Sequence, residues 1–445
     1  MTVREANKLK RNPTDRSPVS GTRGIAVALS SGVLLRIAGA AVNLLAVPIG
    51  LQVLGQQDYA ASVAILSLAG WLTVGSLGLG NVSAISAAEF KHDSEKDNEV
   101  FWQIVIAAGA TVTLGSLLAI APFMLFLRNL VEHVSPAGRQ ELTYTSYYCF
   151  FAFAVCAIGS PFEGRYVGLL RTGYCNFVRL VWQAVAVAML IATVLYLRSV
   201  FALCFALTIA PAGSALWFIA QGVRDFPRPR NGRLRMSTLL RLVGQGIGFL
   251  TSSLTVLFYG GGSLPVFALA FGPGQLATAA VVSRIIQVYF SGTAVLLHPL
   301  SAALRHALKD NDVSWARTTL IRSLVGLISV GSTSAIMLIC FGDIAIAKWT
   351  GTALPNIHEW MLPLAVMIFA ISWSYLWVYV WFALHGALLV AILATVEVIT
   401  ISGIYMIAGA ALNPAWSLYV SSAIMLVVSG GVLPLAALRS GRMTL

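Results

Sequence analysis

Three charged residues lie inside long apolar stretches of the sequence, where a charge is costly and therefore informative. Arg36 lies about eleven residues into the run 25–50, Arg284 about nine residues into the run 275–304, and Glu397 in the middle of a later run. At 1.5 Å per residue, both arginines should lie roughly 14–17 Å from the start of their runs. Guanidinium groups suit phosphate because their planar fork donates two hydrogen bonds at once. We therefore expect Arg36 and Arg284 to line a cationic site for a pyrophosphate-like anion.

Other roles stay open for these three residues. Each arginine can instead pair with a carboxylate or with the carboxyl end of a helix. Glu397, in the segment ILATVEVITIS, is the one acid expected at a comparable depth. It can be the partner of an arginine, take up a coupling ion or proton, or make a structural hydrogen bond.

An aromatic stripe is the next candidate for a binding role. Trp373, Trp377 and Trp381 recur every fourth residue in the run 360–384, so they share one helix face. Aromatic faces can stack on sugar rings, which would suit the path of a glycolipid. The alternative, which we favour, is packing against lipid and in an interfacial belt.

No motif for an enzyme reaction accompanies these residues. The sequence lacks the phosphate-binding GxxxxGK[ST] pattern, the GxSxG nucleophile pattern and the HExxH zinc pattern. No pair of histidines or acids has the spacing of metal ligands. A multispan glycosyltransferase should also carry clustered acids or a large soluble loop. We therefore expect no enzyme activity, no cofactor and no metal.

The elements that position these residues follow from composition. Of 445 residues, 58% are hydrophobic and only 10% are charged, which is too few charges for the surface of a soluble protein. Each membrane-spanning helix needs about 20 apolar residues. We expect an all-α fold, a polytopic membrane protein with about twelve transmembrane helices. The expected spans are 25–50, 59–88, 101–127, 144–168, 176–197, 200–222, 241–262, 275–304, 318–341, 360–384, 386–410 and 414–438.

The basic residues predict the orientation in the membrane. With the N-terminus in the cytoplasm, 23 of the 29 Lys and Arg fall in cytoplasmic segments and four in periplasmic ones. This bias indicates a multi-pass protein of the cell inner membrane with both termini in the cytoplasm. It also explains the formal net charge of +12 without nucleic acid as a partner.

A basic linker divides the chain into two similar halves. LLRIAGAAVNLL at 34–45 resembles LLRLVGQGIGFL at 239–250, and NVSAISAAEFKHD at 81–93 resembles HPLSAALRHALKD at 298–310. Matches in the same order indicate two six-helix bundles related by a parallel repeat, unless Leu- and Ala-rich helices are simply alike. The expected domains are a cytoplasmic basic tail at 1–24, a bundle at 25–222, the linker at 223–240, a bundle at 241–438 and a cytoplasmic tail at 439–445.

The first two spans also carry a family pattern. The arginine-bearing first span runs through Pro48 into GLQVLGQQDYAASVAILSLAGWLTVGSLGLGN, and its turn runs from Leu54 to Tyr59, with Ala60 where glycine is common. This opening resembles bacterial O-antigen and exopolysaccharide flippases of the multidrug/oligosaccharidyl-lipid/polysaccharide exporter superfamily. The span pattern extends the resemblance over the whole chain.

The resemblance implies a function. Such a flippase moves a polyprenyl-pyrophosphate-linked oligosaccharide from the cytoplasmic to the periplasmic leaflet by alternating access, for lipopolysaccharide or exopolysaccharide biosynthesis. It implies membrane lipids, a polysaccharide polymerase and export machinery as partners, and a pyrophosphate-binding role for Arg36 and Arg284. Two other functions stay open. One is a cation-coupled drug or metabolite exporter of the same superfamily, which should carry acids in the cavity of the first half. The other is a non-transporting membrane scaffold.

Overall fold

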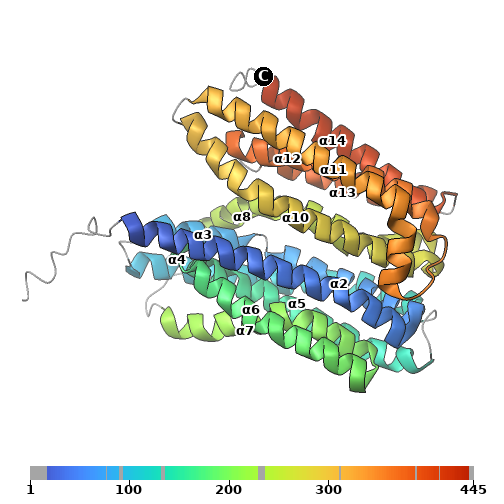
Figure 1. The fold of residues 1–445 in the computed structure, drawn as a ribbon. Coiled ribbons are helices and arrows are strands. Elements are labelled where there is room, and N and C mark those ends of the chain that lie inside the picture. The colour runs from blue at the N-terminus through green and yellow to red at the C-terminus, as the bar shows by residue number, and fades with distance from the viewer. Residues whose placement is uncertain are drawn as a thin grey trace, which may run out of the picture.

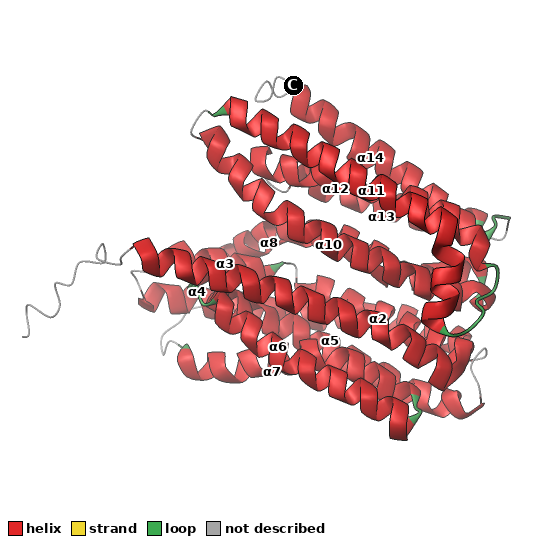
Figure 2. Cartoon of the chain, viewed as in Figure 1, coloured by secondary structure: helices red, strands yellow, loops and turns green. Residues whose placement is uncertain are grey.

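The chain folds into long helices joined by short loops. The computed structural model describes residues 18–76, 78–89, 94–131, 136–228, 236–309, 312–385, 388–409 and 411–439. No strand occurs in these ranges (Figure 2). Nine helical runs within them are long and apolar enough to cross a membrane. The prediction of an all-α polytopic membrane protein is confirmed.

The first half of the chain occupies the positions of the first six predicted spans. Its elements are α2 (Pro18–Gly70), the 3-10 turn η2 (Trp71–Ser76), α3 (Leu79–Glu89), α4 (Ser94–Val131), α5 (Pro136–Gly168), α6 (Thr172–Ala192), the π-helical turn η3 (Thr193–Leu197) and α7 (Val200–Asp225). α2 holds two spans, whose legs meet at Gly55 with φ 82° and ψ 172°. Only glycine adopts this conformation readily, so Gly55 fixes the place of the turn.

The second half occupies the positions of the last six predicted spans. Its elements are α8 (Met236–Leu257), the π-helical turn η4 (Phe258–Gly262), α9 (Leu264–Phe271), the 3-10 turn η5 (Pro273–Gln275), α10 (Leu276–Lys309), α11 (Val313–Thr350), α12 (Ile357–His385), α13 (Leu388–Ala408), the 3-10 turn η6 (Pro414–Trp416) and α14 (Ser417–Arg439). The predicted end of the seventh span at residue 262 is wrong. Gly261, at φ 130°, lies in a π-helical turn there, and α9 extends the span to Phe271.

Two glycines occupy equivalent positions in the two halves of the chain. Gly55 ends the first leg of α2, and Gly272 ends α9 with almost the same backbone, φ 76° and ψ 176°. They lie 217 residues apart, the same offset that relates 81–93 to 298–310 in the sequence. By this offset the counterpart of Arg36 is Ser253, not the arginine of LLRLVG, and the counterpart of Arg284 is Ser67.

The two halves form two lobes, as Figure 1 shows. We call α2–α7 the N-lobe and α8–α14 the C-lobe. The lobes diverge toward the end that carries the start of α2 and the end of α14, and they converge at the opposite end, where α11 joins α12 (Figure 1). Within a membrane, contacts between helices depend on close packing rather than on the exclusion of water.

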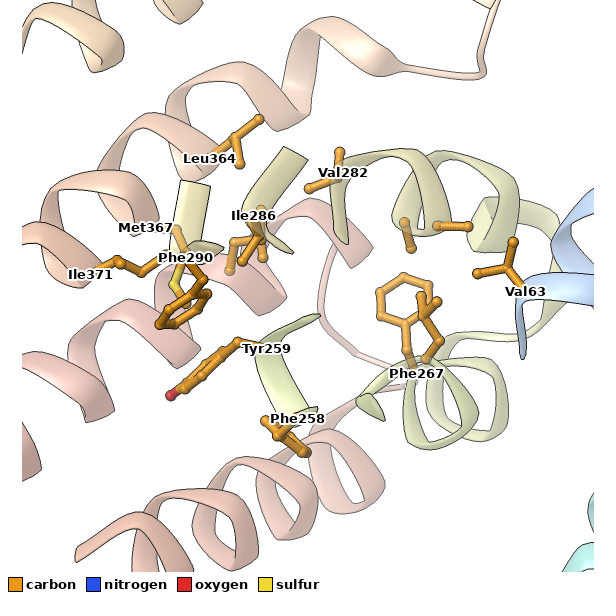
Figure 3. Close-up of a cluster of buried hydrophobic side chains, with 14 of the residues drawn as sticks. Val63, Phe258, Tyr259, Phe267, Val282, Ile286, Phe290, Leu364, Met367 and Ile371 are labelled. Atoms are coloured by element: carbon orange, nitrogen blue, oxygen red, sulfur yellow. The ribbon is translucent and has the colours of Figure 1, made fainter. Parts of the chain in front are cut away.

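Apolar side chains join the lobes where they converge. Figure 3 shows Val63 of α2 at the edge of a C-lobe cluster that includes Phe267, Val282 and Ile286. All four side chains are at most 4% exposed. The shared core therefore holds the lobes together at one end and leaves the other end free to open.

Candidate functional site

A large cavity lies between the lobes. Its volume is about 1280 Å³, and its lining comes from α2, α3, α5, α6 and α7 of the N-lobe and from α8, η4, α10 and α12 of the C-lobe. Ligand pockets for drug-sized molecules usually measure about 300–1,000 Å³. The cavity therefore has room for a ligand larger than a typical drug.

Hydrogen bonds between the lobes close one end of this space. They run from Gln52 Nε2 to Thr350 O (3.3 Å), from Gln56 Nε2 to Ala353 O (2.8 Å) and from Trp349 Nε1 to Leu44 O (3.1 Å). We call these three bonds the latch. The latch lies at the convergent end of the lobes, so the cavity is closed on the side opposite the start of α2 and the end of α14 (Figure 1).

Arg284 reaches the cavity from α10. Its Nη1 donates to Asn43 Oδ1 of the N-lobe at 3.1 Å and to Gln287 Oε1 at 2.9 Å. No described carboxylate pairs with it. The guanidinium is thus held by neutral oxygens, which orient it and leave its charge uncompensated.

Arg36 reaches the same cavity from α2. Its side chain is exposed and makes no hydrogen bond or ion pair with another described residue. Tyr379 of α12 lines the same cavity as Arg36. The structure therefore brings the two predicted arginines, one from each lobe, into one cavity.

The arginines are staggered in depth rather than level. Arg284 bonds Asn43, which lies seven residues beyond Arg36 on α2, or about 10 Å along the helix axis. The equal depth expected from the span limits is therefore not observed for the backbone. No carboxylate is among the described residues that line the cavity around the two arginines.

Glu397 does not pair with either arginine. It is fully buried in the C-lobe, where Ser429 Oγ donates to its Oε1, and its Oε2 has no partner among the described residues. It is absent from the lining of the cavity. Of the three roles left open by the sequence, the arginine partnership is therefore not observed, and the structural hydrogen bond is.

The tryptophan stripe does not face the cavity. Trp373 Nε1 donates to Gly430 O of α14 at 2.9 Å, and Trp377 and Trp381 are 5% and 9% exposed. Tyr375 and Tyr379, on another face of α12, line the cavity instead. Burial inside the protein, with a bond to α14 for Trp373, is therefore what the structure shows for the tryptophans.

Several polar residues of the cavity were missed from the sequence. Asn43 follows Arg36 by seven residues, and Gln287 and Ser291 follow Arg284 by three and seven, and all of them line the cavity. Positions three and seven apart share a helix face. A search for polar residues at these spacings around each buried charge would have found them.

Comparisons with known proteins bear on the fold. No protein-family model matches the sequence, and no curated protein matches it. Among solved structures, a multidrug resistance MATE family transporter of the MOP superfamily, described as inward-facing, is 15% identical, with a TM-score of 0.66 over 92% of this chain and 97% of that chain.

Two further structures agree. A MOP superfamily transporter from Pyrococcus furiosus is 13% identical, with a TM-score of 0.61 over 94% of this chain and 96% of that chain. A eukaryotic MATE transporter is also 13% identical, with a TM-score of 0.59 over 95% of this chain and 98% of that chain. At these identities the likeness shows the fold alone. The chain is therefore a multi-pass membrane protein with the two-lobed fold of MATE transporters of the MOP superfamily.

Proposed function

We propose that the protein is a flippase for a polyprenyl-pyrophosphate-linked oligosaccharide, moving it between leaflets by alternating access. The observation that carries this proposal is the pair of arginines, one from each lobe, that enter one cavity without a described carboxylate partner. An anion that contacts both arginines would contact both lobes. It can therefore influence how the lobes move relative to each other, which is what coupling of binding to transport requires.

The shape of the substrate fits the geometry of the cavity. The sugar and pyrophosphate would enter between the lobes, while the polyprenyl tail stays in lipid. Polar side chains in the cavity lining, such as Asn43, Gln183 and Gln287, would offer hydrogen bonds to sugar hydroxyls, each of which costs several kcal/mol if left unpaired in hydrocarbon. Arg36, nearer the open end, would meet the pyrophosphate before Arg284, which lies toward the latch.

Location and partners are part of the same proposal. The distribution of basic residues supports an inner-membrane protein with both termini in the cytoplasm, so the cavity would open toward the cytoplasmic leaflet. A polysaccharide polymerase and export machinery would use the product. We propose no enzymatic step. Ion or proton coupling stays a possible role for Glu397, whose Oε2 has no partner among the described residues.

A cation-coupled drug or metabolite exporter is the second candidate. The likeness to a structure described as a multidrug resistance transporter favours it at the level of fold. Five aromatic side chains in the cavity lining would also suit a flat aromatic drug: Phe153, Phe290, Tyr375, Tyr379 and Phe382. The two cationic side chains favour an anionic substrate instead, because they would repel a cationic drug.

The test is complementation of a strain from which this gene is deleted. We expect the wild type to restore surface polysaccharide, Arg36→Ala and Arg284→Ala to lower it at least tenfold, and the Lys variants to restore it in part, since Lys keeps the charge and loses the fork. Arg322→Ala is the matched control, because Arg322 is exposed on α11 and lies outside the cavity.

The outcomes separate the candidates. Full surface polysaccharide from both Ala variants, at equal protein levels, would contradict the flippase proposal. Normal polysaccharide in the deletion strain itself, together with new sensitivity to cationic drugs, would identify an exporter. Normal polysaccharide and normal drug resistance in that strain would favour a scaffold.

A further inference from the structure

A second, smaller space adjoins the main cavity on its N-lobe side. This niche has a volume of about 340 Å³ and is lined by residues of η2, α3, α5 and α6 together with Leu257 of α8. Asn81, Ala84 and Leu257 line both spaces. The two spaces therefore adjoin at these residues, close enough for one elongated ligand to contact both.

An ion pair forms the polar wall of the niche. Arg179 Nη2 lies 2.6 Å from Glu163 Oε2, and the two side chains are 46% and 19% exposed. This bond uses one of the five N–H donors of the guanidinium and one carboxylate oxygen. Neither side chain bonds another described residue, so donors and acceptors remain for a ligand.

The chemistry of the niche differs from that around Arg36 and Arg284. The Glu163–Arg179 pair is neutral overall and offers donors and acceptors side by side, and Asn81 adds an amide that does both. Thr73, Ser76 and Ser160 also line the niche. Their hydroxyls donate to backbone carbonyls three residues earlier, so their oxygens can still accept a hydrogen bond. A sugar hydroxyl both donates and accepts hydrogen bonds, whereas a phosphate at neutral pH mainly accepts them. The niche thus matches a sugar, and the arginines of the main cavity match a phosphate.

The niche also lies at the depth of Arg36. Asn176 Nδ2 of α6 donates to Ser31 Oγ of α2 at 3.0 Å, which aligns these neighbouring helices. They are the first and fifth spans and run in the same direction. Arg179 lies three residues beyond Asn176, and Arg36 lies five beyond Ser31, so their backbones differ in depth by about 3 Å. A group held by Arg36 would therefore lie level with the niche.

We infer that the niche binds the sugar attached to the pyrophosphate, with Glu163, Arg179 and Asn81 as its recognising side chains. This inference rests on the proposed function and divides the site in two. Arg36 and Arg284 bind the part that every such lipid shares, and the niche distinguishes the sugar.

The test measures the binding of two lipids to purified protein in nanodiscs. One lipid is sugar-free undecaprenyl pyrophosphate, and the other is the glycosylated polyprenyl pyrophosphate that accumulates in the deletion strain. We expect Glu163→Gln, Arg179→Gln and Asn81→Ala to weaken binding of the glycosylated lipid about tenfold, the loss of a hydrogen bond to a charged group. Binding of the sugar-free lipid should stay within twofold. Arg36→Ala should weaken both, and Arg322→Ala neither.

Each result decides between the two proposals. Normal binding of both lipids by the niche variants, with loss of both in Arg36→Ala, would overturn the inference and leave the flippase proposal standing. Normal binding in Arg36→Ala as well would overturn the flippase proposal. Equal loss of both lipids in the niche variants would also overturn the inference, because the pair would then serve structure or phosphate binding. Arg179→Lys keeps the ion pair and provides a folded variant if the Gln variants lower the melting temperature.

Discussion

At the scale of single residues, arginines of this protein serve two different purposes. Arg36 and Arg284 face the cavity, whereas Arg165 is 3% exposed at the end of α5 and lies between two aromatic rings. Its guanidinium carbon lies 4.4 Å from the centre of the Phe101 ring and 4.2 Å from that of Phe226, and its Nη2 bonds Asn98 Oδ1 at 2.6 Å. These contacts point to a structural role for Arg165, which packs against Phe226, where α7 ends and the linker begins.

The Arg165 contact predicts the effect of a single substitution. Phe226→Leu keeps an apolar side chain but removes the ring, and with it a cation–π contact worth about 1–2 kcal/mol when desolvated. We expect a lower melting temperature of the purified protein in detergent. Phe151→Leu is the control, because the Phe151 side chain is 65% exposed. Equal melting temperatures for the two variants would show that the ring contact adds no stability.

At the scale of elements, close helix contact decides where the chain can bend. α3 crosses α5 so closely that a Cβ built on Gly164 would lie 1.9 Å from Gly80 O, and one on Gly168 would lie 2.2 Å from Ala84 O. Glycines four residues apart allow such an approach between membrane helices. The contact anchors α3 after the break at η2 and so places the wall of the niche.

A pair of matched substitutions tests this contact. Gly164→Ala forces α3 away from α5, and overpacking of this kind usually costs about 1–3 kcal/mol. Gly109→Ala, on α4, has nothing within 4 Å of the added carbon and should gain up to about 1 kcal/mol of helix propensity. The melting temperature should therefore fall in the first variant and hold or rise in the second. A fall of the same size in both would contradict a packing origin.

At the scale of the whole molecule, the lobes are in contact at the latch, and the cavity lies between them. The lobes meet at the latch and across the shared apolar core, and they diverge toward the termini. If the protein works by alternating access, the latch must break while the opposite end closes. The three latch bonds end on backbone carbonyls of the other lobe. They can therefore release without leaving a charge unpaired.

A cross-link across the latch tests this motion. Gln56→Cys/Ala353→Cys, in a Cys340→Ser background, should cross-link with a short thiol reagent and lose transport of the accumulated lipid in proteoliposomes. The pair Glu359→Cys/Asn413→Cys is the matched control, because Asn413 Nδ2 bonds Glu359 Oε2 at 2.8 Å within the C-lobe. Its cross-link should leave transport unchanged. Undiminished transport by the cross-linked latch variant would mean that the lobes do not separate there.

The sequence by itself determined the fold class, the approximate positions of most spans and the three charges inside them. Composition and apolar runs are sufficient for this, since a span needs little more than length and hydropathy. Asn43 and Gln287, which share a helix face with Arg36 and Arg284, were not predicted, although their spacing in the sequence contains that information.

Only the tertiary structure decided which faces of the helices meet the cavity. Lipid-facing and core-facing sides of a membrane helix are both apolar, so hydropathy does not distinguish them. For that reason the sequence suggested the tryptophan face of α12 as a binding face, whereas in the structure Tyr375 and Tyr379 of another face line the cavity. For the same reason the sequence left open a pairing of Glu397 with the arginines, which the structure does not show. Arg179 was counted with the cytoplasmic charges, because its place beside the cavity depends on how α6 packs against α2.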